Sequence, residues 1–273
     1  MSEAPPLLSL RLSVDYRNKP GVLRDVVLDI QPGEILGLVG QSGSGKSTIS
    51  LAILRLLHLK GGTASGNLFF NGEDLSAKSE SQMRSLRGRE ISIVLQSPLS
   101  SLNPALRIGS QLSEAWRAHA AGTQDQCAAA ISNALTSVSL PSDPDFLRRR
   151  PSQLSVGQAQ RVIIAMAILH RPSLLIADEA TSALDTITQS EILALFARLN
   201  RELGTGILYI SHDLLSVAAL CHRIAILDSG EIVECGPTSQ IFGAPHHPYT
   251  QQLVSALPRI PTFSPELDPV LQP

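Results

Sequence analysis

The sequence predicts an α/β protein with a doubly wound, mostly parallel sheet, and three observations support this fold class. Residues 35–39 are short and wholly apolar, as expected of a strand that helices cover on both faces of a sheet. Similar apolar segments recur later, at 174–177, 207–210 and 224–227, and a further strand is expected at 232–235. Segments with helical spacing of apolar residues lie among them, at 48–58, 158–170 and 186–203. Strands that alternate with helices are typical of a parallel sheet.

The rest of the chain adds weaker strand signals and a helical insertion. Apolar and polar side chains alternate as in half-buried strands at 8–14 and 26–30, and shorter strands are expected at 67–70 and 91–95. Strand signals then disappear until about residue 153, and helical spacing appears at 108–121 and 124–138. The proline-rich tail after Gly236 is expected to be irregular, apart from a helix near 250–257.

Composition narrows the class of protein. The 273 residues are 43% hydrophobic and 17% charged, as in an ordinary globular protein, and the net charge of −2 gives no support to a nucleic-acid partner. The longest uncharged apolar run, 162–169, is far shorter than the roughly 20 residues of a membrane helix. The N-terminus lacks the basic start of a signal peptide, so a cytosolic chain with three reduced cysteines is expected.

A phosphate-binding loop is predicted between the strand at 35–39 and the helix that follows it. The pattern G-x-x-x-x-G-K-S/T is filled by Gly40, Gln41, Ser42, Gly43, Ser44, Gly45, Lys46 and Ser47, and Thr48 follows in the helix. Glycines let backbone N–H groups point at phosphate oxygens, and the helix N-terminus adds partial positive charge. Lys46 would reach the β- and γ-phosphates, and the Ser47 hydroxyl would bind Mg²⁺. The sequence therefore predicts ATP and Mg²⁺ as ligands.

Two carboxylates follow the apolar strand at 174–177. Ligands of parallel-sheet proteins bind at the carboxyl ends of strands, so Asp178 and Glu179 are expected beside the phosphate loop. Asp178 is suited to hold Mg²⁺, and Glu179 is suited to deprotonate the water that attacks the γ-phosphate. Without the phosphate loop, a pair of helix-capping acids would explain them equally well.

Two polar residues at the ends of other strands complete the predicted catalytic set. Gln96 follows the strand at 91–95, and its amide is suited to contact both the metal and the water. His212 follows the strand at 207–210 and is suited to donate a hydrogen bond to the γ-phosphate. Each one alone would be read as an ordinary loop residue.

A third motif resembles the signature of one family. Residues 154–161, Leu-Ser-Val-Gly-Gln-Ala-Gln-Arg, resemble the LSGGQ-x-QR signature of ABC ATPases, about twenty residues before the acidic strand. Residues 181–185 are similar to the family's D-loop, and 211–213 to the segment of its switch histidine. Tyr16 stands where that family places the aromatic ring that stacks on adenine. The motifs occur in the family's order along nearly the whole chain.

The resemblance implies a RecA-like P-loop core with an antiparallel β subdomain and a helical subdomain. It places the core at 1–96 and 158–235, the helical subdomain at 97–157 and a C-terminal tail at 236–273. It also implies a head-to-tail dimer in which each signature closes over the ATP of the other subunit. The residues expected to make that contact are Ser155, Gly157, Gln158 and Asp185.

One residue departs from the family pattern. Val156 replaces the first glycine of the signature, and a β-branched side chain adopts positive φ poorly and adds bulk beside the partner's triphosphate. The hypothesis is that the ATP site completed by this signature is the less active of two unequal sites.

Two segments are similar to the oligopeptide, dipeptide and nickel importers among ABC proteins. These are 96–104, which match Q-x-P-x-x-S-L-N-P, and 245–258, which match an HPYT tail. The likeness implies a peripheral subunit at the cytoplasmic face of the inner membrane. The partners implied are two transmembrane permeases, a second and non-identical ATPase subunit, and an external solute-binding protein that delivers peptides, nickel or a metal chelate. No cysteine follows Cys235, so no iron–sulfur cluster is expected.

Two other classes remain open at this stage. A soluble ABC ATPase of an assembly such as a C–P lyase type complex would resemble the same group. A nucleotide-gated regulator without hydrolysis would be expected to lack Glu179 or His212, and both residues are present.

Overall fold

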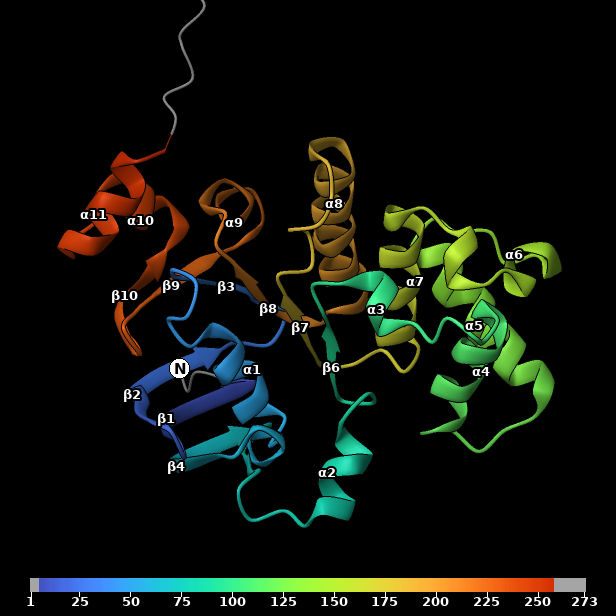
Figure 1. The fold of residues 1–273 in the computed structure, drawn as a ribbon, viewed down its shortest axis with the longest axis horizontal. Helices are drawn as coiled ribbons and strands as arrows, with labels where there is room; N and C mark the ends of the chain where they lie inside the picture. Colours follow the sequence, from blue (N-terminus) through green and yellow to red (C-terminus); the bar gives the residue numbers. More distant parts are fainter. Residues whose placement is uncertain (1–4, 258–273) are drawn as a thin grey trace, which may run out of the picture.

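A six-stranded sheet runs through the centre of the computed structural model, which describes residues 5–257 (Figure 1). Its order is β10-β9-β3-β8-β7-β6, and the neighbours from β9 to β6 pair in parallel. The strands are β3 (Ile35–Val39), β6 (Ile91–Val94), β7 (Leu174–Asp178), β8 (Gly206–Ser211), β9 (Arg223–Asp228) and β10 (Glu231–Pro237). Only β10 pairs antiparallel within this sheet. The predicted mostly parallel sheet is confirmed.

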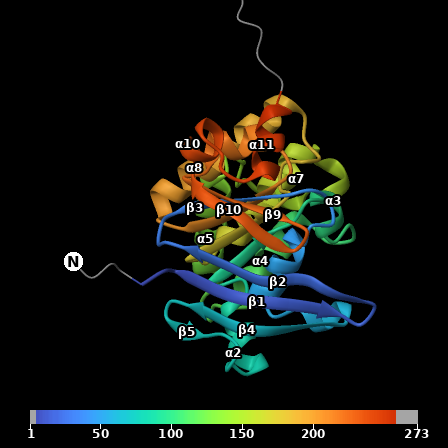
Figure 2. The same ribbon diagram turned by 90° about the vertical axis from the view of Figure 1, so that its left-hand side faces the viewer.

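A second, antiparallel sheet lies across one face of the first, as Figure 2 shows from the side. Its order is β2-β1-β4-β5. The strands are β1 (Leu8–Tyr16), β2 (Lys19–Ile30), β4 (Gly62–Phe70) and β5 (Glu73–Asp74). Buried residues alternate with more exposed ones along β1, because its inner face covers the core and its outer face meets water. This sheet is the predicted antiparallel β subdomain.

The central sheet is apolar on both faces because both are covered. In β3, Leu36 and Leu38 join the core beneath the antiparallel sheet, together with α1 (Lys46–Ile53). Ile35 and Val39 point to the opposite core, where α8 (Thr186–Leu203) and α9 (Leu214–Leu220) pack. A strand buried on both sides carries no polar alternation, which explains the wholly apolar segment.

The predicted helical insertion forms the other end of the molecule (Figure 1, right). It contains α3 (Pro98–Ser101), α4 (Ile108–Arg117), α5 (Gln124–Ser137), α6 (Pro144–Arg148) and the 3₁₀ turn Pro151–Gln153. The long helix α7 (Val156–Ile168) packs against α3, α4, α5 and β6, and so joins the insertion to the central sheet. Trp116 of α4 is only 8% exposed and belongs to this core.

Several predicted elements differ from the observed ones. The helix expected at 48–58 ends at Ile53, and a separate 3₁₀ turn, Leu57–Lys60, follows after Arg55 takes a left-handed backbone with φ of 52°. The helices at 108–121 and 124–138 end earlier, at Arg117 and Ser137. By contrast, α8 covers the predicted residues and ends at Gly204, whose φ of 67° suits a C-terminal cap.

The helix predicted near 250–257 is confirmed as α11 (Pro248–Ser255), which lies two residues earlier at each end. The rest of the described tail was expected to be irregular, and this is wrong at α10 (Thr238–Gly243), which directly follows β10. Short helices at α2 (Glu80–Leu86), α6 and α9 were also not predicted. These helices are five to seven residues long, too short for a helical period to stand out, and side-chain caps from Ser79, Asp143 and Asp213 begin them. Residues 258–273 lie outside the described part, so the end of the predicted tail is not placed.

Candidate active site

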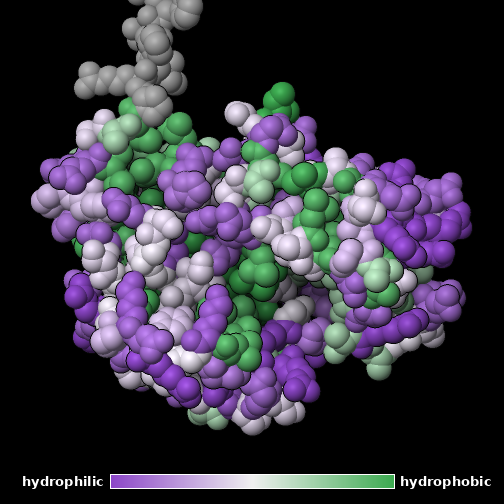
Figure 3. Space-filling view, viewed as in Figure 1, coloured by the Kyte–Doolittle hydropathy of each residue, from purple (hydrophilic) through white to green (hydrophobic). Residues whose placement is uncertain are grey.

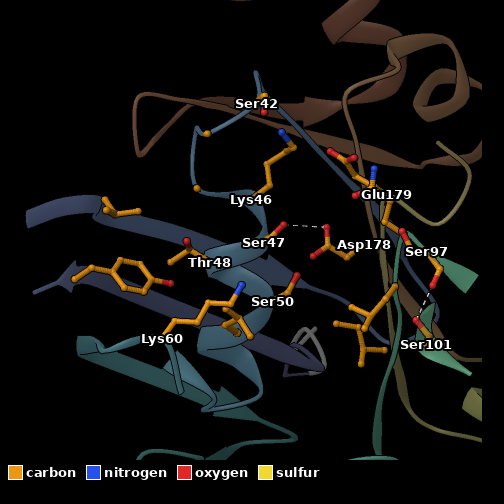
Figure 4. A pocket seen from close by; sticks show the side chains of 18 of the residues that line it. Ser42, Lys46, Ser47, Thr48, Ser50, Lys60, Ser97, Ser101, Asp178 and Glu179 are labelled. Atoms are coloured by element: carbon orange, nitrogen blue, oxygen red, sulfur yellow. Dashed lines mark hydrogen bonds between the residues drawn. The ribbon is translucent and has the colours of Figure 1, made fainter. Parts of the chain in front are cut away.

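A cavity of about 840 Å³ opens where the two sheets meet the helical insertion (Figure 4). Its walls come from the phosphate loop, α1, and the carboxyl ends of β6 and β7. The predicted site residues that line it are Tyr16, Ser42, Gly43, Gly45, Lys46, Ser47, Thr48, Gln96, Asp178 and Glu179. Because parallel strands end at one edge of the sheet, residues far apart in sequence meet there.

The phosphate loop connects β3 to α1 and depends on close backbone packing. Gly45 is the N-cap of α1 with φ of 113°, a conformation that only glycine adopts readily. A side chain at Gly40 would place its Cβ atom 2.3 Å from the Leu227 carbonyl oxygen, so this residue must also be small. The loop is therefore held between the antiparallel sheet and the end of β9.

The Lys46 side chain is buried and lies along its own loop. Its Nζ donates hydrogen bonds to the Gly40 carbonyl at 2.7 Å and the Gln41 carbonyl at 2.9 Å. Burial lowers the pKa of the Lys46 ammonium, and the nearby carboxylates of Glu179 and Asp178 oppose that shift. A desolvated cation at the N-terminus of a helix is suited to bind an anion.

Asp178 ends β7 and turns its carboxylate toward the start of α1. The Ser47 hydroxyl donates to its Oδ1 atom at 3.3 Å, as Figure 4 shows. Burial raises the pKa of Asp178, the hydrogen bond from Ser47 lowers it, and the charge of Glu179 raises it further. A buried carboxylate beside a hydroxyl offers two oxygen ligands of the kind that Mg²⁺ prefers.

Glu179 stands directly after β7 with a left-handed backbone, φ of 51°. Its N–H donates to the Ile210 carbonyl of β8 at 2.9 Å, which fixes this conformation. Its Oε1 atom lies 3.5 Å from Nδ1 of His212, which follows β8. Non-glycine residues in this region are strained, and such strain clusters at functional sites.

The outer walls of the cavity hold the remaining predicted residues. Gln96 is exposed and lines the cavity where β6 has ended. Tyr16 lies at the end of β1, against Gly62. A Cβ atom at Gly62 would lie 2.8 Å from Cε1 of the Tyr16 ring, so the missing side chain makes room for the ring.

The signature residues lie away from this cavity: none of Ser155, Gly157, Gln158 and Asp185 lines it. Ser155 caps α7, since its hydroxyl accepts from the Gln158 N–H at 3.2 Å while the Gln158 side chain accepts from the Ser155 N–H at 3.1 Å. Asp185 caps α8 by accepting from the N–H of Thr188 at 3.0 Å and from its hydroxyl at 2.7 Å. A Cβ atom at Gly157 would lie 2.9 Å from Thr188, so the two helix starts face each other within one chain.

Val156 takes the first helical position of α7, and no positive φ occurs there. The expectation of backbone strain at Val156 is therefore wrong, because α7 starts two residues earlier than predicted. The side chain is 39% exposed. Only the bulk of the side chain can then affect a neighbouring ligand.

The cavity also contains residues that sequence reasoning missed. Lys19 and Lys60 add positive charge, and Ser97, Ser100 and Ser101 add hydroxyl groups. Lys60 reaches the site only because the helix after the phosphate loop breaks early, and Lys19 only because β2 begins seven residues before the predicted strand. A lysine near a turn has no sequence pattern that would predict a place in a binding site.

Comparisons with known proteins agree with these motifs. Residues 23–182 match the model of the ABC transporter family. The chain belongs to this family. Residues 233–269 match a second model, that of the oligopeptide/dipeptide transporter C-terminal region. The predicted resemblance is thus confirmed, including the peptide-importer group. No described helix has the length and apolar character needed to cross a membrane.

Two curated relatives are each 41% identical to the chain. One is the dipeptide transport ATP-binding protein DppD of Escherichia coli, aligned over 91% of this chain and 77% of its own length. The other is the glutathione import ATP-binding protein GsiA of Salmonella typhimurium, aligned over 87% of this chain. The match covers only 39% of the length of GsiA.

Solved structures resemble the fold. Clostridium perfringens cbiO1, part of the ABC transporter complex cbiONQ, superimposes with a TM-score of 0.76 at 25% identity, over 88% of this chain and 91% of that one. The ATP-binding cassette MJ0796, in a dimeric post-hydrolysis state with ADP and Pi, gives a TM-score of 0.71 at 26% identity. That match covers 85% of this chain and 98% of MJ0796.

Proposed function

We propose that the chain is the ATP-binding and ATP-hydrolysing subunit of an ABC importer of peptides. The observation that carries the proposal is the meeting of a buried Lys46 with Asp178 and Glu179 on one cavity. Transfer of a phosphoryl group to water requires a cation for the phosphates, an acidic side chain for the metal ion and a general base for the water. The same cavity is large enough for a nucleotide, since ligand sites are typically about 300–1,000 Å³.

The nucleotide lies along the cavity in this proposal. The ring of Tyr16 stacks on the adenine at one end, and the backbone N–H groups between Ser42 and Thr48 hold the phosphates at the other. Lys46 leaves the carbonyls of Gly40 and Gln41 and turns to the β- and γ-phosphates. That exchange is favourable because the buried ammonium gains a full negative charge in place of two neutral oxygens.

The oxygens of Ser47 and Asp178 fit Mg²⁺, with the Gln96 amide as a third group on the same cavity. Burial raises the pKa of Asp178 although Ser47 and Lys46 oppose that shift, and a bound divalent ion would favour the ionised carboxylate. When bound, Mg²⁺ neutralises the charge that develops on the phosphate oxygens. The chain itself contributes the position of these three groups and the negative charge of Asp178.

Glu179 is the general base of the proposed reaction. Its carboxylate borders the cavity and is held by the Ile210 contact of its backbone, so it can accept a proton from water beside the γ-phosphate. His212, 3.5 Å away, orients that carboxylate and donates to the γ-phosphate. Gln96 helps to place the water from the opposite wall.

A second ATPase subunit completes the site. The cavity is open, and the capped N-terminus of α7, with Ser155 and Gly157, offers N–H groups to a triphosphate on a facing chain. Gln158 and Asp185 lie beside it in this head-to-tail dimer. Val156 adds bulk at this surface, so the site that it covers is the less active one when two different subunits pair.

The surface proposed for the permease subunits lies where the helical subdomain, 97–157, meets the core, 1–96 and 158–235. Hydrophobic residues gather around the hollow between these parts in Figure 3. A mostly apolar groove of about 340 Å³ lies between β6 and α7, bordered by Leu54, Ile93, Leu95, Ile163 and Met166. We propose that permease helices dock there, at the cytoplasmic face of the inner membrane. Two permeases and an external binding protein complete the importer.

The likeness to DppD and GsiA favours a dipeptide or related peptide as solute over nickel or a metal chelate. The tail, 236–273, belongs to the same group through its family match. Selectivity resides in the permeases and binding protein, so stimulation of ATP hydrolysis in the reconstituted complex by a peptide panel identifies the solute.

Two experiments test the function. Glu179→Gln keeps the shape of the side chain and is expected to retain ATP while hydrolysis falls by at least about 100-fold, because the base is lost. Substantial residual turnover would move the catalytic role to another residue. Purification from membranes is expected to recover two polytopic permeases, whereas recovery of soluble partners alone would replace the importer with a soluble assembly ATPase.

A further inference from the structure

The cavity of the candidate active site carries more positive charge than the proposed reaction uses. The lysines of the chain are Lys19, Lys46, Lys60 and Lys78, and the first three line this one cavity. Only Lys46 has a role in the proposed function. Asp178 and Glu179 are the carboxylates among the described lining residues, so three cations face two anions before any ligand binds. The additional charge favours an anionic ligand.

Lys19 and Lys60 are not engaged by acidic groups of the described chain. Within residues 5–257, no carboxylate oxygen lies within 4.0 Å of either ammonium nitrogen. Lys78, by contrast, forms an ion pair with Glu73, and neither residue of that pair lines the cavity. Lys19 and Lys60 can therefore pair with a ligand without first breaking an ion pair.

Strand register places Lys19 beside Tyr16. The two residues are partners where β1 and β2 pair antiparallel. Residues directly opposite each other in such a pair point to the same face of the sheet. That face is the inner one, because Val14, two residues before Tyr16, is fully buried. The side chain of Lys19 therefore extends on the same side as the ring, in agreement with its place in the cavity wall.

Lys60 approaches the same ring from the other neighbour of β1. It ends a 3₁₀ turn, and Gly61, with φ of 70°, leads the chain into β4. This strand begins at Gly62, which pairs with Tyr16 and leaves room for its ring. In Figure 4 the Lys60 side chain extends into the cavity toward α1, where Thr48 lies. The two lysines thus flank the ring, one from β2 and one from the turn before β4.

The α-phosphate is the anionic group nearest to these lysines in the proposed complex. Only the ribose separates it from a base that stacks on Tyr16, whereas the β- and γ-phosphates lie farther along the cavity, at Lys46. An ammonium group has three hydrogen-bond donors and no acceptor. It therefore suits phosphate oxygens, which only accept, and offers nothing to the amino group of adenine.

We propose that Lys19 and Lys60 are further binding residues of this site, which contact the α-phosphate of the nucleotide from two sides. The inference rests on the proposed function, because it requires the base to stack on Tyr16. ATP and ADP share the α-phosphate, so the two lysines hold the nucleotide equally before and after hydrolysis. Lys46 differs in this respect, since one of its two phosphate partners leaves with the reaction.

Substitution of both lysines by methionine tests the proposal, because methionine keeps the apolar stem and removes the charge. Both lysines are exposed, and exposed ion pairs are weak, so each single variant is expected to bind nucleotide about 2- to 5-fold less tightly. Lys19→Met with Lys60→Met is expected to weaken binding about 4- to 25-fold. Calorimetry with Mg²⁺ is expected to give the same factor for ADP and for a non-hydrolysable ATP analogue.

A second readout separates binding from chemistry. At saturating ATP, kcat of the double variant is expected to stay within about twofold of the wild type, because neither lysine contacts the γ-phosphate. The affinity of the wild type is expected to fall more steeply with ionic strength than that of the double variant, since two screened charge contacts are absent from the variant.

Lys78→Met is the matched control, because it removes the same charge away from the cavity, and it is expected to bind nucleotide as the wild type does. Arginine at both positions 19 and 60 is expected to restore most of the affinity. Unchanged affinity of the double methionine variant, an equal loss in Lys78→Met, or a loss for the ATP analogue alone would each overturn the proposal. A wild-type chain that binds neither nucleotide would refute the proposed function instead.

Discussion

Replacing Glu179 by glycine is expected to stabilise the protein relative to alanine at the same position, although both variants lose hydrolysis. Glu179 has φ of 51°, a region that costs a residue with a Cβ atom about 1–2 kcal/mol. Glycine avoids that cost but gains freedom in the unfolded chain, worth about 0.4–1 kcal/mol. The net advantage of glycine over alanine is therefore about 1 kcal/mol.

The comparison isolates the backbone because both variants remove the same carboxylate and its charge. The assay is the free energy of unfolding in urea, without nucleotide, supported by the thermal midpoint. For a chain of this size, 1 kcal/mol corresponds to a shift of about 2–4 °C. ATP hydrolysis is measured on the same samples and is expected to be lost in both.

Ala194 provides the control site. It is exposed in the middle of α8, where glycine costs about 1 kcal/mol relative to alanine. Ala194→Gly is thus expected to lower stability, opposite in sign to the change from alanine to glycine at position 179. If glycine at 179 proved less stable than alanine there, the backbone would not be strained and the reasoning would fail.

Three further predictions concern the loop, the acid and the signature. Gly40→Ala is expected to abolish ATP binding and lower the unfolding midpoint, because its Cβ atom would lie 2.3 Å from the Leu227 carbonyl oxygen; calorimetry showing normal ATP affinity would contradict this. Asp178→Asn is expected to stabilise the nucleotide-free protein at pH 7. The folded-state pKa of Asp178 is raised, so its ionised form opposes folding, and the advantage should vanish as the pH falls below about 4, as urea unfolding at both pH values would reveal. Ser155→Ala is expected to cost about 1 kcal/mol through loss of the α7 cap even without nucleotide; unchanged unfolding would mean that the cap contributes nothing.

The sequence predicted helix bounds correctly where apolar spacing and the residues that begin and end the helix agree. The helix at 186–203 has a strong period, a capping aspartate before it and Gly204 after it, and the structure reproduces its bounds. The helix expected at 48–58 failed because Arg55 breaks it, and the residues that follow take part in a separate turn. The spacing of apolar residues is helical in both segments, so it does not show that one helix ends early.

The phosphate loop was predicted from its fixed residue types. The acidic pair was predicted from its place at the end of an apolar strand. The structure confirms that Lys46, Asp178 and Glu179 line one cavity. The lysines that also border it were not predictable, because Lys19 and Lys60 reach it through the bounds of neighbouring elements.

The order of residues alone determined the chemistry of this protein: glycines where the backbone must bend, one lysine, two acids at a strand end and a capped helix start. These patterns follow from local rules, since each residue type suits one predicted contact, with a phosphate, a metal ion or a backbone N–H group. Only the tertiary structure decided that Glu179 carries strain and that Lys19 and Lys60 border the same cavity as Lys46. Both depend on contacts between segments distant in sequence, which the packing of the sheet and its covering helices creates.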